Sequence, residues 1–160
     1  DTIYGIGCDA TNSKSINKIR KAKQRDTKPF SIIAPSKIWI KTNCNVKNHV
    51  RYLKELPGKY TLIFEIKNIN SIPIKNINHN SNTIGIRIPK NWFSKIVSKS
   101  KKPFITTSVN ISGESNITFL NQIPKEIKKY IDYAIDVGEL NNDPSTIIDL
   151  TKEKEKIIRK

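Results

Sequence analysis

The sequence predicts a single α/β domain in which helices flank a twisted, mixed β-sheet. Its 160 residues suit one hydrophobic core. Short isoleucine-rich runs alternate apolar and polar residues, which is typical of half-buried strands. Helical patterns are few and do not alternate regularly with the strands, so a mixed sheet is favoured over a parallel one. We expect one domain over residues 1–160, with an N-terminus that lacks the first element of the fold.

The first half of the chain is predicted to hold three strands and two helices. One helix is expected from Ser13, as its N-cap, to about Arg25, because its isoleucines then share one face. The other elements expected here are a helix over residues 46–56 and strands over residues 2–5, 30–33 and 60–66.

The second half begins with residues 67–82, which are rich in asparagine, isoleucine and serine and are expected to form a loop or an irregular hairpin. No apolar run in the sequence approaches the ~18 residues of a membrane span, so we expect a cytoplasmic protein with no membrane partner. The remaining patterns predict helices over residues 92–98 and 124–131, and strands over residues 83–88, 104–110, 133–136, 145–150 and 156–159.

Two of these strands carry an unusual polar face. Side chains alternate along a strand, so every second residue points to the same side of the sheet. The solvent-exposed face of an ordinary strand carries long charged side chains. Short hydroxyl and amide groups beside a guanidinium instead predict the floor of a site for a small charged ligand. The two faces consist of Thr83, Gly85 and Arg87, and of Thr106, Ser108 and Asn110.

The chain has a net charge of +15 and a pI near 9.9. Such a charge attracts polyanions, including nucleotides, tRNA and other nucleic acids. A lysine-rich genomic composition explains the same excess, and both explanations stay open at this point. In either case an anionic substrate is favoured over a cationic one.

Several common kinds of site find little support. Cys8 and Cys44 are the only cysteines, and no CxxC motif occurs, so two reduced thiols are expected. The two histidines stand apart, which argues against a zinc site or a histidine-activated nucleophile. Residues 5–10 fit the loose dinucleotide pattern G-x-G-x-x-G/A. The helix that follows starts too late, however, to place its N-terminus under a pyrophosphate.

A basic cluster lies at the end of the first predicted helix, formed by Lys23, Arg25 and Lys28. Cations at a helix C-terminus offset the helix dipole, which is a purely structural explanation. A guanidinium and two ammonium groups also suit phosphoryl oxygens, so a triphosphate clamp is the functional alternative.

Six short motifs follow one another in a characteristic order and spacing. With them, nearly the whole chain closely resembles the YrdC-like threonylcarbamoyl-AMP synthase family, in its short single-domain form. The resemblance implies the YrdC-like fold, a twisted α/β sheet with a basic concave cavity. The motifs are Thr2-Ile3-Tyr4-Gly5, Lys23-Gln24-Arg25 with Lys28-Pro29, Pro57-Gly58-x-Tyr60-Thr61, Arg87-x-Pro89, Ser108-Val109-Asn110-x-Ser112-Gly113 and Pro144-Ser145-Thr146-Ile147.

The resemblance also implies a reaction. Members of the family condense ATP, L-threonine and bicarbonate into threonylcarbamoyl-AMP and release pyrophosphate. The product feeds tRNA N6-threonylcarbamoyladenosine modification, so the downstream tRNA threonylcarbamoyl-transfer machinery is an expected partner and tRNA a further candidate. Mg²⁺ is the expected cofactor and arrives with ATP, although no carboxylate pair in the sequence stands out as its ligand.

By the same resemblance, residues of this chain match functional positions of the family. Those at the nucleotide phosphates, expected to be catalytic, are Lys23, Arg25, Ser108 and Asn110. Further ATP contacts are expected from Lys28, Thr83 and Arg159. Threonine contacts are expected from Thr2, Arg87, Thr106 and Ser145. The serine that the family frequently carries is replaced here by Asn116.

Two other interpretations stay open. One is a non-catalytic module of the same fold that binds double-stranded RNA or tRNA through the basic surface. The other is a domain of a larger carbamoyl-transfer enzyme of the hydrogenase-maturation type, which shares the fold. In the leading hypothesis, catalysis rests on positioning and charge neutralisation rather than on a protein nucleophile.

Overall fold

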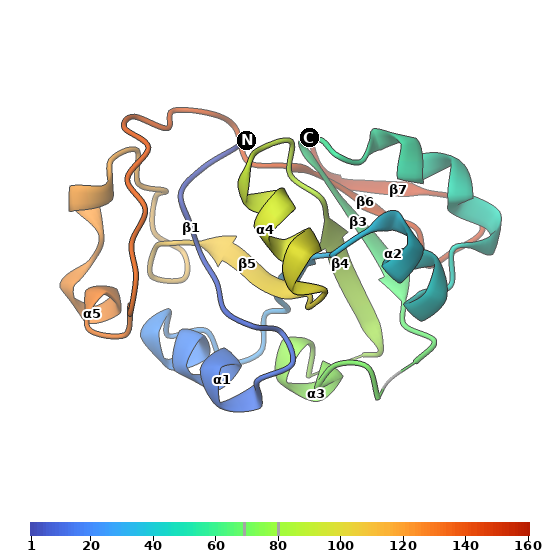
Figure 1. The fold of residues 1–160 in the computed structure, drawn as a ribbon, viewed down its shortest axis with the longest axis horizontal. Helices are drawn as coiled ribbons and strands as arrows, with labels where there is room; N and C mark the ends of the chain where they lie inside the picture. Colours follow the sequence, from blue (N-terminus) through green and yellow to red (C-terminus); the bar gives the residue numbers. More distant parts are fainter. Residues whose placement is uncertain (69, 80) are drawn as a thin grey trace.

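The computed structural model describes residues 1–160 except residues 69 and 80, and it contains one seven-stranded mixed sheet (Figure 1). The order of strands across the sheet is β1-β5-β2-β4-β3-β6-β7. The pairs β2–β4 and β3–β6 are parallel and the other pairs antiparallel, which confirms the predicted fold class. The strands are β1 (Gly5–Ile6), β2 (Ser31–Ile33), β3 (Tyr60–Glu65), β4 (Thr83–Arg87), β5 (Phe104–Ser108), β6 (Thr146–Asp149) and β7 (Lys156–Arg159).

Short helices surround this sheet. Figure 1 shows α1 and α3 side by side at its lower edge, while α4 crosses the face turned toward the viewer. No helix in the described part of the chain is both long enough and apolar enough to cross a membrane. The helices are α1 (Ser13–Ala22), α2 (Lys37–Asn43), the 3₁₀ helix η1 (Lys47–Glu55), α3 (Ile74–Ile77), α4 (Phe93–Ser100), the 3₁₀ helix η2 (Leu120–Gln122) and α5 (Lys125–Lys128).

The main core lies between the sheet and the helices α1, α2 and η1. Ile16 of α1, Ile40 of α2 and Leu53 of η1 are buried there against the apolar side of β2, β3 and β4. Removing these side chains from water is the main force that fixes each helix on the sheet. The same packing assigns the opposite, polar side of the central strands to the solvent or to a ligand.

The first helix differs from its prediction at both ends. Asn12, rather than Ser13, caps α1, because the Asn12 side chain accepts a hydrogen bond of 3.1 Å from the Ser15 amide. The helix ends at Ala22, short of the predicted Arg25. The chain then turns through Gln24, which has a positive φ of 50° and cannot continue a right-handed helix.

The predicted strand over residues 133–136 is wrong. Among the described residues, no strand of the sheet pairs with residues 133–136, and Tyr133 is 94% exposed. The segment is held instead by the Tyr4 hydroxyl, which lies 2.7 Å from the Gly138 carbonyl and accepts a hydrogen bond from the Val137 amide. An apolar alternation predicts a strand only where a neighbouring strand offers a free edge.

Other differences concern short elements. Residues 46–56 are helical as predicted, but η1 is a 3₁₀ helix with a non-helical His49. Helix α2 was not predicted, although Ser36 caps it by accepting a hydrogen bond of 3.0 Å from the Trp39 amide. The predicted loop over residues 67–82 contains α3, and residues 69 and 80 of that stretch lie outside the described part. The opening strand is Gly5–Ile6 and shares only Gly5 with the predicted residues 2–5, and the helix predicted over residues 124–131 is shortened to Lys125–Lys128.

Candidate active site

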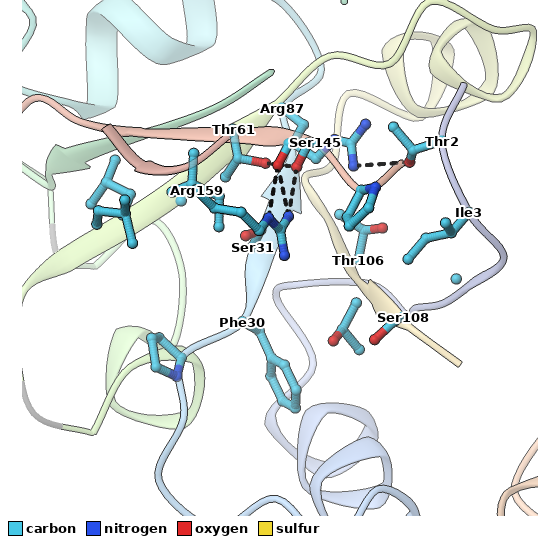
Figure 2. Close-up of a pocket in the computed structure, with 18 of the residues that line it drawn as sticks. Thr2, Ile3, Phe30, Ser31, Thr61, Arg87, Thr106, Ser108, Ser145 and Arg159 are labelled. Carbon is cyan, nitrogen blue, oxygen red and sulfur yellow. Dashed lines mark hydrogen bonds between the residues drawn. The ribbon is translucent and has the colours of Figure 1, made fainter. Parts of the chain in front are cut away.

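The two polar strand faces meet in a single cavity of about 400 Å³ (Figure 2). On β4, Thr83, Gly85 and Arg87 line the cavity, while Ile84 and Ile86 point the other way into the core. On β5, Thr106 and Ser108 line it. Because β2 lies between these strands, it joins the two faces into one surface. The sequence prediction that both faces form one floor is therefore confirmed, except for Asn110, which does not line the cavity.

Three arginines line the cavity, and none of the described residues that line it is acidic. Arg25 follows α1, Arg87 ends β4 and Arg159 ends β7. Burial lowers the pKa of each guanidinium from its ordinary value, yet an arginine stays charged at neutral pH. Like charges that share a partly desolvated cavity are relieved by a bound anion. The cavity is thus suited to a ligand with negative charge.

Arg25 is fixed at the mouth of the cavity by hydrogen bonds to backbone carbonyls. Its Nη2 donates to Pro29 O at 2.6 Å and its Nε to Lys28 O at 3.2 Å. Its guanidinium carbon lies 5.1 Å from the centre of the Phe30 ring, and Nη1 donates to Thr107 Oγ1 at 3.3 Å. These contacts orient the guanidinium plane before any ligand arrives.

Arg87 already binds a carboxylate in this structure. Its Nη2 lies 2.7 Å from Asp1 Oδ1, and the other Asp1 oxygen accepts a hydrogen bond of 2.8 Å from the Lys90 amide. Nη1 donates to Thr2 Oγ1 at 3.4 Å. Burial, and secondarily Arg159, lowers the pKa of Arg87 to about 10. Its Nε is buried without a hydrogen-bond partner among the described residues.

Lys23 lies behind the cavity rather than in its wall. Its side chain is fully buried, and its Nζ donates to Ser108 O, to Asn110 O at 2.5 Å and to Asn110 Oδ1 at 3.1 Å. Its own carbonyl accepts a hydrogen bond of 3.0 Å from the Ser112 amide. Burial, and then the charge of Arg25, lowers the Lys23 pKa to about 8. All three ammonium protons therefore hold the end of β5 and the residues that follow it.

Asn110 completes this support. Its Oδ1 accepts a hydrogen bond of 2.5 Å from Ser108 Oγ, and its Nδ2 donates to Glu114 O at 2.5 Å. Ser108 lines the cavity, whereas Asn110 orients it from the interior. Of the predicted basic cluster, only Arg25 lines the cavity, because Lys23 is buried behind it and Lys28 is exposed outside its lining.

The predicted threonine-binding residues, and two of the three further ATP-binding residues, all line the cavity. Thr2 and Ser145 are buried in its wall, and Thr83 Oγ1 lies 2.7 Å from Ser81 Oγ. Arg159 donates to Ser145 O from Nε at 3.0 Å and from Nη2 at 2.8 Å. Sequence reasoning assigned no ligand role to four other lining residues with short polar side chains, although Thr61 belongs to one of the motifs. They are Ser31, Thr61, Asn78 and Thr107, and the folded structure is needed to place them, because Asn78 lies outside the strands and Thr107 alternates with Thr106 along β5.

The structure also explains the glycine-rich pattern over residues 5–10 and the two cysteines. A Cβ on Gly7 would lie 2.0 Å from the Ile105 carbonyl oxygen, so this glycine allows close contact with β5 rather than forming a dinucleotide loop. Burial raises the pKa of both Cys8 and Cys44 to about 12, so neither is a ready thiolate nucleophile. The described residues contain no group of three histidine, cysteine or acidic side chains able to hold a metal ion.

Comparison with known proteins identifies the family. The Sua5/YciO/YrdC family model, described as "Telomere recombination", matches residues 1–160. This chain belongs to that family. The family-level resemblance expected from the six motifs is thereby confirmed, and the Sua5/YciO/YrdC architecture accounts for the mixed sheet described above.

Relatives within the Sua5/YciO/YrdC family carry different names. A putative threonylcarbamoyl-AMP synthase of Methanocaldococcus jannaschii is 38% identical over 159 residues, which cover 96% of this chain and 73% of that protein. The structure of P. abyssi Sua5 complexed with L-threonine matches with a TM-score of 0.85 and 25% identity, over 99% of this chain and 47% of that one. The chain thus spans about half of that Sua5 chain. Escherichia coli YciO matches with a TM-score of 0.76 and 26% identity, over 100% of this chain and 79% of that one.

Proposed function

We propose that this protein is an L-threonylcarbamoyladenylate synthase, which converts ATP, L-threonine and bicarbonate into threonylcarbamoyl-AMP and pyrophosphate for tRNA N6-threonylcarbamoyladenosine modification. The observation that carries the proposal is the convergence of Arg25, Arg87 and Arg159 on one hydroxyl-lined cavity whose described lining residues include no acidic side chain. The M. jannaschii relative bears the name of this synthase, and P. abyssi Sua5 has been solved with L-threonine, which supports the same reaction class.

The nucleotide phosphates would lie between Arg25 and Ser108. The reaction needs the carboxylated amine of threonine to attack the α-phosphate while pyrophosphate leaves, so negative charge develops on the phosphate oxygens. A guanidinium fixed in advance by Pro29 O and Lys28 O stabilises this charge without reorganising. Lys23 and Asn110 contribute by holding Ser108. Lys28, Thr83 and Arg159 are proposed as the further ATP contacts.

The amino acid would lie at the Arg87 end of the cavity. There its carboxylate would take the position on the guanidinium that the Asp1 carboxylate has in this structure. Thr2, Thr106 and Ser145 supply short hydroxyl groups for the remaining polar atoms of L-threonine. Bicarbonate, or the carbamate formed from it, would lie between the two ends, where positive charge also favours it. No protein nucleophile is required.

Mg²⁺ is proposed only as a companion of ATP. The described residues that line the cavity offer no carboxylate, the ligand type that Mg²⁺ prefers. We therefore propose that the phosphates and water, rather than the described side chains, would supply its ligands.

An omission experiment tests the proposed function. Pyrophosphate release is measured with ATP, L-threonine and bicarbonate together, and with each one left out in turn. Release is expected only from the complete mixture. Release that does not depend on threonine, or none from well-folded protein, would contradict the proposal. In the second case, salt-sensitive tRNA binding without ATP affinity would favour the RNA-binding module instead.

A further inference from the structure

Three neighbouring strands bring Thr61, Ser145 and Arg159 together on one wall of the cavity (Figure 2). In the strand register, Thr61 of β3 pairs with Ile147 of β6, and Ile147 pairs with Arg159 of β7. Ser145 stands two residues before Ile147 and so lies on the same side of the sheet. None of the motif arguments gave Thr61 a role.

The hydroxyl groups of Thr61 and Ser145 form a buried pair. Their oxygens lie 2.7 Å apart, and each residue is only 3% exposed. Arg159 Nη2 lies 3.3 Å from Ser145 Oγ, and the same guanidinium donates twice to Ser145 O. Because arginine has no acceptor, Ser145 Oγ must accept from Arg159.

The hydroxyl pair has one proton that is not used in a hydrogen bond to any described residue. The two hydroxyl groups carry two protons, and one of them lies between the two oxygens. Among the described residues, the other proton has no acceptor, whichever of the two hydroxyls carries it. Both residues line the cavity, so this proton is available to an acceptor atom of a ligand.

We infer that Thr61 is a positioning residue of the amino-acid site: it fixes the Ser145 hydroxyl so that the pair donates one hydrogen bond to an oxygen of L-threonine. The inference rests on the proposed function. It assigns the donor to the pair rather than to Ser145 alone, because a lone serine hydroxyl held by Arg159 rotates more freely. Gly85 supports this arrangement, since a Cβ there would lie 3.1 Å from Thr61 Cγ2 and crowd the side chain.

Titration calorimetry with L-threonine tests the inference, using wild-type protein and the variants T61V, T61S, S145A and T61V/S145A. T61V keeps the shape of the side chain but removes the hydroxyl, so affinity for L-threonine should fall about tenfold, the usual effect of losing one positioned hydrogen bond. T61S keeps the hydroxyl and should bind within about twofold of wild type. In activity assays the KM for L-threonine should rise for T61V, while the KM for ATP changes much less.

The double variant separates positioning from packing. If Thr61 acts through Ser145, adding T61V to S145A should have almost no further effect on affinity. T146V is the matched control, because Thr146 comes directly after Ser145, as the first residue of β6, and does not line the cavity. The affinity of T146V for L-threonine should therefore equal that of the wild type. T61A is measured as well, so that the test survives if T61V fails to fold. The affinity of T61A for L-threonine should fall as much as that of T61V.

Two results would overturn the inference while leaving the proposed function intact. One is wild-type affinity in folded T61V or T61A, and the other is a full additional loss when T61V is combined with S145A. Wild-type protein that does not bind L-threonine would contradict the proposed function itself, and the inference with it.

Discussion

At the scale of single residues, neighbouring cations in one motif have different tasks. Lys23 gives its three ammonium protons to oxygens of Ser108 and Asn110, whereas Arg25, two residues later, lines the cavity. The sequence shows both as members of one basic cluster. Burial and the turn at Gln24 separate them, and neither is visible before the fold is known.

The buried ammonium of Lys23 predicts an alkaline limit of activity. Its pKa is lowered to about 8, mainly by burial, and loss of one proton removes one of the three bonds that hold the Ser108 region. Turnover should therefore fall about fivefold between pH ~8 and pH ~9, following the protonated fraction of Lys23. Pyrophosphate release measured across this range checks the prediction, and a profile that stays flat to pH ~9.5 would contradict it.

Loss of folding is not the expected cause of that limit. The Lys23 pKa is about 8 in the folded protein, below its ordinary value of 10.5, so between these values the unfolded chain binds more protons. Through this group the free energy of unfolding rises with pH in that window and is lowest below it. Thermal unfolding recorded at the same pH values is the control.

Arg87 allows a test of geometry at constant charge. In R87K the ammonium retains the ion pair with Asp1 but cannot offer two parallel N–H groups to a substrate carboxylate. The KM for L-threonine should rise about 10- to 100-fold, the range for losing a charge-assisted hydrogen bond. R51K is a matched control, because Arg51 pairs with Glu155 on the surface and its side chain is 67% exposed. Equal KM values for the two variants would contradict this role of Arg87.

At the scale of secondary-structure elements, the site depends on β2 lying between β4 and β5. Ser31 pairs with Gly85 on one side and with Thr106 on the other, so three strands present small side chains in one row. Because these side chains are small, they leave space above the strands for a ligand. Gly85 is essential to it, because a Cβ there would lie 2.8 Å from Ser31 Oγ.

A methyl group on β4 should therefore disturb the floor of the cavity. G85A is expected to lower the free energy of unfolding by about 1–2 kcal/mol, because overpacking outweighs the smaller gain from restricting the unfolded chain. The double variant S31A/G85A removes the closest clash and should recover part of this loss. Denaturant unfolding of the two variants measures both effects, and a double variant no more stable than G85A would show that the clash is not the cause.

Periodicity was a good guide to long elements and a poor one to short ones. The alternating faces of β3, β4 and β5 follow from burial of every second residue, so their side chains were placed correctly up to Ser108. The four-residue helices α3 and α5 and the extended segment after residue 131 are set by tertiary contacts such as the Tyr4 hydroxyl. Thr61 was missed for the same reason, since its partner Ser145 is distant in sequence.

At the scale of the whole molecule, the net charge of +15 predicts attraction to tRNA as well as to ATP. Surface charges are screened by salt, whereas charges inside the cavity are screened much less. Between about 50 and about 200 mM salt, tRNA affinity should fall at least about tenfold, while L-threonine affinity changes less than about threefold. Filter binding and calorimetry provide the two measurements. Binding of tRNA that does not respond to salt would contradict an electrostatic surface.

Isotope labelling tests whether one arginine-lined cavity joins all three substrates. The protein is incubated with ATP, L-threonine and ¹³C-bicarbonate, and the quenched mixture is analysed by mass spectrometry. We predict threonylcarbamoyl-AMP that carries the ¹³C label and is absent when R25A replaces the wild-type protein. Folded wild-type protein that yields no labelled adenylate would contradict the proposed reaction, and R25A protein that yields as much as wild type would contradict the role of Arg25.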